Sequence, residues 1–205
     1  ALTLGHLAHY HGTDIKDSLP GLIACLKHGD IYVRMASVTA LGHLGLDAAP
    51  AVDGLIPLLK DPQVGRQKGS KVFIRSGTAR TLGKIGFQAK DALPALRSIL
   101  EGKDLYDRGI TAVAIWRIDS DVTNTLPVMI EALNLVNDGS KWELLEGLEE
   151  MGEGANKAFP DLLNLLKSKG TPNRLSRSTR KRITNLLMKI DPEAATSAGV
   201  EPAVT

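Results

Sequence analysis

The chain has 205 residues, of which 43% are hydrophobic and only 4% aromatic, and its formal net charge is +2. This composition allows a substantial core of aliphatic side chains. The chain contains no run of 18 apolar residues, so no membrane span is predicted. Because Cys25 is the single cysteine, an intramolecular disulfide and a multi-cysteine metal site are excluded. We expect Cys25 to be an inert core thiol.

In chain order, apolar residues recur at helical spacing in a series of short segments. The segments predicted as helices are residues 2–9, 19–27, 31–44, 50–60, 72–85, 91–100, 105–118, 122–135, 141–151, 158–167 and 178–190. Gly86 is suited to the left-handed conformation that ends a helix, and Asp91 to capping the next one. Residues 1–191 are predicted as a single domain, with loops at about 60–71 and 168–178. Residues 192–205 are predicted as a short tail that frays after one turn.

The predicted helices form pairs that repeat along the chain. In the second helix of each pair, one apolar column contains Leu41, Leu82, Ile115 and Leu148, separated by 41, 33 and 33 residues. In the first helix, a second column contains Leu19, Val52, Leu93, Leu126 and Phe159, separated by 33, 41, 33 and 33 residues. One insertion of 8 residues between Leu59 and Ile74 explains the irregular step. Several columns that stay in phase indicate a true repeat.

The second helices carry a motif of Val-Arg or Ile-Arg, a run of small residues, and Leu-Gly-x-Leu-Gly or Leu-Gly-x-Ile-Gly. It covers residues 33–45 and 74–86, with a variant at 107–119. The pattern resembles HEAT repeats, most closely the short phycobilisome-lyase-type HEAT-like repeats. The resemblance implies an all-α fold, a right-handed α-solenoid of about five helix pairs plus an N-terminal half repeat, with the second helices on the concave wall. Such repeats occur in adaptors, bilin lyases, DNA-repair glycosylases and an iron hydroxylase, so fold is implied more specifically than function.

Two further expectations follow from the resemblance. Arg34, Arg75 and Arg108 hold a position that commonly pairs with an acidic residue of the preceding turn, for which Asp30 and Asp104 are the candidates. The first seven residues, ALTLGHL, match the second helix of a repeat that lacks its first helix. We therefore expect the chain to be a piece of a longer protein. The compartment is not indicated, although the cytoplasm is favoured.

The predicted concave wall carries charge in blocks: basic in the middle, acidic on the fourth second helix, and basic again at the end. We predict that this wall binds a protein partner, because Trp and Arg are favoured at interface centres. The alternative is a solvated face on which neighbours half-cover Trp116. The candidate binding residues are Arg80, Lys84, Trp116, Arg117, Trp142, Glu146 and Glu150.

Both long loops inside repeats are basic. Because each joins a first helix to a second helix, both should emerge at one edge of the solenoid. This predicts a basic rim that faces an extended anion, such as nucleic acid, an acidic protein or a membrane surface. The alternative is that lysine and arginine keep flexible loops soluble. The rim residues are Arg66, Lys68, Lys71, Arg174, Arg177, Arg180, Lys181 and Arg182.

No catalytic or metal site is predicted. His6, His9 and His11 lack the spacing of metal ligands, and no nucleophile motif or phosphate-binding glycine loop is present. A glycosylase would use Trp116 and Trp142 with Asp119 or Glu143 as the acid, but the rest of that pattern is absent. We therefore predict a non-catalytic protein-binding or scaffold module without a cofactor. The alternatives are nucleic-acid binding and a lyase or chaperone-like subunit that handles a bilin.

Overall fold

The structure is a computed structural model that describes residues 15–61, 64–67, 70–168 and 175–201. The N-terminal half repeat predicted at residues 2–9 lies outside this range. Within it, no helix is both long enough and apolar enough to cross a membrane. The chain forms two compact units, one made of Ala1–Gly102 and Ala114–Asp121 and the other of Lys103–Val113 and Val122–Thr205. The single domain expected over residues 1–191 stays a prediction.

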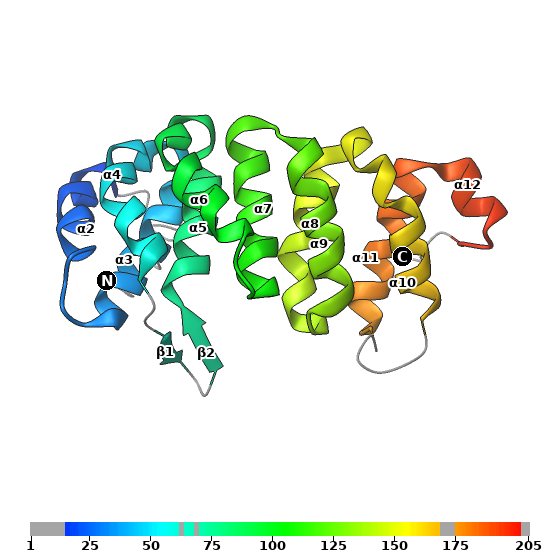
Figure 1. Cartoon of the computed structure of the whole chain (residues 1–205), viewed down its shortest axis with the longest axis horizontal. Helices are drawn as coiled ribbons and strands as arrows, with labels where there is room; N and C mark the ends of the chain where they lie inside the picture. Colours follow the sequence, from blue (N-terminus) through cyan, green and yellow to red (C-terminus); the bar gives the residue numbers. More distant parts are fainter. Residues whose placement is uncertain (1–14, 62–63, 68–69, 169–174, 202–205) are drawn as a thin grey trace. The chain divides into compact units, whose positions relative to one another are not determined.

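Unit 1 consists largely of helix pairs (Figure 1), and apolar side chains such as Leu55 and Leu96 are buried inside it. Leu41 and Leu82 of the predicted column are fully buried and Ile115 nearly so, so one apolar column runs across its second helices. The α-helices are α2 (Leu19–Cys25), α3 (Ile31–Leu44), α4 (Val52–Leu55), α5 (Ile74–Ile85), α6 (Leu93–Leu100) and the second half of α7 (Leu105–Asp119). Between them lie the 3-10 segments η1 (Ile15–Ser18), η2 (Gly45–Ala51), η3 (Ile56–Lys60) and η4 (Gly86–Ala92).

Glycines end the second helices α3 and α5 of unit 1. Gly45 and Gly86 have φ of 54° and 73°, values that favour glycine, as predicted for Gly86. Each is followed by a 3-10 turn that leads into the next first helix. The prediction that Asp91 caps α6 is wrong. The residue before α6 is Ala92, which makes no side-chain cap, and Pro94 occupies the first turn, where the lack of an N–H costs little.

Unit 2 contains the first half of α7 and the remaining helices. These are α8 (Val122–Leu135), α9 (Lys141–Met151), α10 (Phe159–Lys167), α11 (Arg177–Ile190) and α12 (Pro192–Ser197), with η5 (Asp138–Ser140) and η6 (Gly152–Ala158). Lys141 is fully buried and donates from Nζ to the carbonyls of Leu133 and Val136, which satisfies the end of α8. The predicted tail begins with α12. Asp191 accepts a hydrogen bond from Ala194 N at 2.9 Å, and α12 packs on α11.

The inserted segment of repeat two contains two strands. The predicted loop is in fact an antiparallel hairpin of β1 (Val64–Gln67) and β2 (Ser70–Phe73), which leads directly into α5 (Figure 1). In its register Val64 lies opposite Phe73, and Gln67 lies opposite Ser70. Two residues, one of them glycine, separate the strands in the sequence, which is the commonest connection of a hairpin.

Candidate functional site

In unit 1, two glycines of the second helices lie close to cationic side chains of the next second helix. A Cβ added at Gly42 would lie 3.8 Å from Cδ of Lys84, and one added at Gly83 would lie 3.6 Å from Cδ of Arg117. The methylene stems of Lys84 and Arg117 therefore cover glycine positions, as long cationic side chains commonly cover apolar surface. Lys84 is exposed and Arg117 is half-buried. The structure thus places two of the predicted binding residues in equivalent positions one repeat apart.

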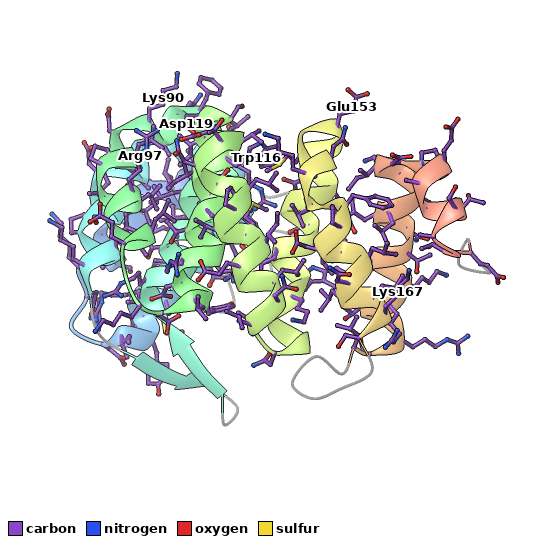
Figure 2. The ribbon with its side chains drawn as sticks, turned by 45° about the vertical axis from the view of Figure 1, so that its right-hand side comes forward. Lys90, Arg97, Trp116, Asp119, Glu153 and Lys167 are labelled. Carbon is purple, nitrogen blue, oxygen red and sulfur yellow. The ribbon has the colours of Figure 1, made fainter. Side chains whose placement is uncertain are left out.

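The other predicted binding residues of unit 1 lie on the same helices. Trp116 precedes Arg117 on α7, Arg80 lies one turn before Lys84 on α5, and both are half-buried. Arg97 of α6 lies beside the end of α7, where its Nη2 is 2.6 Å from Oδ2 of Asp119 (Figure 2). Because this ion pair holds the Asp119 carboxylate, the glycosylase alternative loses one of its two candidate acids. The other candidate, Glu143, is buried.

In unit 2, Trp142, Glu149 and Arg182 form one cluster. The Trp142 side chain is 62% exposed, and the Arg182 guanidinium stacks over its ring at 3.7 Å from the centroid. Nε and Nη2 of Arg182 donate to the two Glu149 carboxylate oxygens at 2.6 and 2.7 Å, and Nη1 donates to the Trp142 carbonyl at 3.2 Å. Of the predicted residues nearby, Glu146 is half-buried and Glu150 is exposed.

Two of the predicted rim cations are engaged in structural contacts. Arg180 donates to the carbonyls of Leu166 at 2.7 Å and Ser168 at 3.1 Å, at the end of α10. Arg182 is held in the cluster described above. Both guanidinium groups donate within the protein, and their assignment to the basic rim stays a prediction.

The remaining rim residues are placed unevenly. Arg177 and Lys181 are exposed on α11. Arg66 and Lys71 lie opposite each other on β1 and β2. Lys68 and Arg174 lie outside the described residues. The basic rim as a whole therefore stays a prediction.

The arginine that recurs in the second helices has a structural role, as expected, but the predicted acidic partners are wrong. Arg34 Nη2 lies 3.0 Å from Asp61, and Arg108 Nη2 lies 2.7 Å from Glu131. Asp30 caps α3 by accepting from Tyr32 N.

Two further residues considered for these ion pairs, Asp104 and Arg75, bond to backbone groups. Asp104 accepts from Asp107 N at the start of α7 instead of pairing with Arg108. Arg75 donates to the Leu59 carbonyl at 3.0 Å. Cys25, expected in the core, is half-buried at the end of α2.

The sequence did not predict the cavity of about 610 Å³ that opens in unit 1 beside the Arg34–Asp61 pair. Its volume is in the range of small-molecule sites. It lies between α2 and the segment formed by α4 and η3, and Ile23, Leu26 and Lys27 are among its lining residues. Among the described residues no group of three or more His, Cys, Asp or Glu is placed to hold a metal. His6, His9 and His11 lie outside them.

Comparison with known proteins places this geometry among HEAT-like proteins. No family model matches the chain. A relative, phycocyanobilin lyase subunit alpha of Microchaete diplosiphon, is 38% identical over 86 residues, which are 42% of this chain and 28% of that protein. A solved structure, the complex of CpcE and CpcF of phycocyanin lyase from a Nostoc species, matches with a TM-score of 0.59 at 24% identity. The structural match covers 86% of this chain and 66% of the matched chain. At this level of identity the match shows that the two chains share a fold.

The chain is an α-solenoid of HEAT-like repeats. The resemblance stated from the sequence is therefore confirmed, whereas the right-handed superhelix and its concave wall stay predictions. Our prediction that the protein is not an enzyme is wrong, because both matches carry the names of lyase subunits. Neither match supports nucleic acid as a partner.

Proposed function

We propose that the chain works as a bilin-lyase-type subunit that binds a linear tetrapyrrole and helps to attach it to a protein. One observation carries this proposal, the 38% identity over 86 residues to a phycocyanobilin lyase subunit. The fold shared with a phycocyanin lyase complex supports it. The chain spans 28% of the first protein and 66% of the second, so the tetrapyrrole and the acceptor protein are parts of the proposal.

The side chains on α5 and α7 of unit 1 suit such a ligand. A bilin is a flat conjugated chain of four pyrrole rings with two propionate carboxylates. Lys84 and Arg117 can bind carboxylates, because their stems lie over Gly42 and Gly83 and both side chains reach the surface, Lys84 exposed and Arg117 half-buried. The half-buried Trp116 adds an aromatic surface next to Arg117. We propose this group as the bilin-binding surface.

We also propose that the subunit acts together with a protein partner, as the solved relative is a complex of two chains. The protein-partner binding predicted from the sequence for these helices therefore remains part of the proposal. In this view the protein holds the bilin while a second chain or the acceptor protein completes the assembly. Within unit 1, the surface formed by Lys84, Trp116 and Arg117 and the 610 Å³ cavity are the two alternative binding sites for the bilin.

Titration with phycocyanobilin tests the proposal. Binding should shift the visible absorption of the free bilin, and Lys84→Glu with Arg117→Glu should raise Kd about tenfold or more, because a charge-assisted hydrogen bond contributes about 1.5–3 kcal/mol. Lys27→Glu changes an exposed lysine that lines the cavity and serves as the matched control. A larger loss in Lys27→Glu would move the site to the cavity. Absence of any spectral shift at about 100-fold excess of protein over a micromolar bilin would refute the function.

A further inference from the structure

Trp142 is a preorganised anchor on the surface of unit 2. Its ring is largely exposed, yet Arg182 covers one face, and Glu149 in turn fixes Arg182 through two hydrogen bonds. A ring that is already held in place loses little conformational entropy when a partner covers it. Tryptophan and arginine are also among the residues most enriched at the energetic centres of protein interfaces. The exposed face of Trp142 is therefore suited to contact a binding partner.

The occupant of this surface is a protein and not a small anion. All three nitrogens of the Arg182 guanidinium already donate, two to the Glu149 carboxylate and one to the Trp142 carbonyl. An anion would have to displace a bidentate carboxylate pair, which is among the strongest side-chain interactions. The open face of the Trp142 ring remains for apolar contact.

The charges on the two helices around Trp142 are opposite in sign. On α9, Glu146 and Glu150 follow Trp142 at intervals of four residues, so they lie on the same side of the helix as Trp142. On α11, Lys181 and Lys189 are exposed, and Lys189 reaches α9 by donating to the Glu149 carbonyl at 3.1 Å. The helices α9 and α11 are in contact within unit 2, so an acidic and a basic stripe lie side by side.

Such a face is complementary to itself. A two-fold axis parallel to the helices would place the α9 of one copy opposite the α11 of another, so each acidic stripe would meet a basic stripe twice in one interface. We propose that a second copy of this chain docks on the α9–α11 face, with Trp142 of each copy packed against the start of α11 of the other. This inference does not depend on bilin binding.

The size of the face sets the expected strength. Helices of 11 and 14 residues are about 16–21 Å long at 1.5 Å per residue, and two helices side by side are about 20 Å wide. The interface therefore falls at or below the lower end of the sizes of stable complexes. We expect a weak dimer with Kd of about 10–100 µM.

Sedimentation equilibrium of the purified chain at about 1–300 µM, a range chosen to span that Kd, tests the proposal. The wild-type mass should rise from one copy towards two, and Trp142→Ala should stay monomeric. Phe87→Ala is the matched control, because Phe87 is equally exposed at 61% but belongs to unit 1, and it should dimerise like the wild type. A wild-type chain that stays monomeric overturns the proposal, whichever other protein binds the face. So does a Phe87→Ala variant that loses the dimer together with Trp142→Ala.

A charge exchange tests the pairing itself. Glu146→Lys with Glu150→Lys, and separately Lys181→Glu with Lys189→Glu, should each be monomeric because like charges meet. An equal mixture of the two double variants should form a dimer again, since opposite charges then meet on both halves of the interface. Circular dichroism checks that each variant is folded. A mixture that stays monomeric while both variants are folded overturns the proposed pairing of α9 with α11.

Discussion

A methyl group added at Gly83 should destabilise the protein, whereas the same change at Gly77 in the same helix should stabilise it. Replacing glycine by alanine inside a helix normally adds about 0.5–1 kcal/mol of stability. At Gly77 the nearest atom to the new Cβ is Cγ1 of Val38 at 3.9 Å, an ordinary contact. At Gly83 the new Cβ would lie 2.9 Å from Cα of Ala114, a backbone atom that cannot move by itself.

Overpacking of a close contact costs about 1–3 kcal/mol, so Gly83→Ala should lose about 1 kcal/mol net and Gly77→Ala should gain up to 1 kcal/mol. Urea unfolding followed by circular dichroism measures both. With a slope of about 2 kcal/mol per molar, the two midpoints should differ by roughly 0.5–1 M. A Gly83→Ala midpoint equal to or above that of Gly77→Ala would refute the close approach of α5 and α7 that places Arg117 over Gly83.

Three further changes test other contacts. Arg34→Ala should lower the free energy of unfolding by about 3 kcal/mol in denaturant titration, because it leaves the half-buried Asp61 carboxylate without its guanidinium; a loss below about 1 kcal/mol would show the pair to be ordinary surface charge. Lys141→Met keeps the side-chain volume but removes buried donors to the end of α8, so calorimetry should show a loss of about 1–3 kcal/mol. Asp191→Ala removes the cap of α12 and should cost about 1 kcal/mol; faster amide exchange at residues 192–197 with unchanged α11 would show it, and unchanged exchange would contradict it.

The period of the apolar residues and the glycines that end helices were enough to predict the helices. The bounds predicted for α3, α8 and α9 are those observed. At α9, a small polar residue and Lys141 mark the start and Gly152 marks the end, where φ of 57° favours glycine. The repeat phase then predicted which residues are buried. Leu41, Leu82 and Leu148, all in one column, are fully buried.

Side-chain partners could not be predicted in the same way. An aspartate just before a helix can pair with a nearby arginine or accept from the helix's own N–H groups, and at Asp30 the local backbone bond forms while Arg34 reaches Asp61. The Arg182 partners Glu149 and Trp142 are 33 and 40 residues away. The repeat indicates which helices are neighbours, but rotamers decide which of several carboxylates a long cation reaches.

At Lys84, the packing of the side-chain stem can be tested separately from the proposed binding by its charge. Lys84 and Arg117 hold the same place in their helices. Their stems pack over Gly42 and Gly83 whether or not their charges bind a ligand. Lys84→Met keeps a stem of similar length and removes only the charge. If the charge binds a bilin propionate, this variant should bind phycocyanobilin about tenfold more weakly with an unchanged free energy of unfolding. If stability falls and binding does not, the lysine is part of the packing and the proposed bilin surface is wrong.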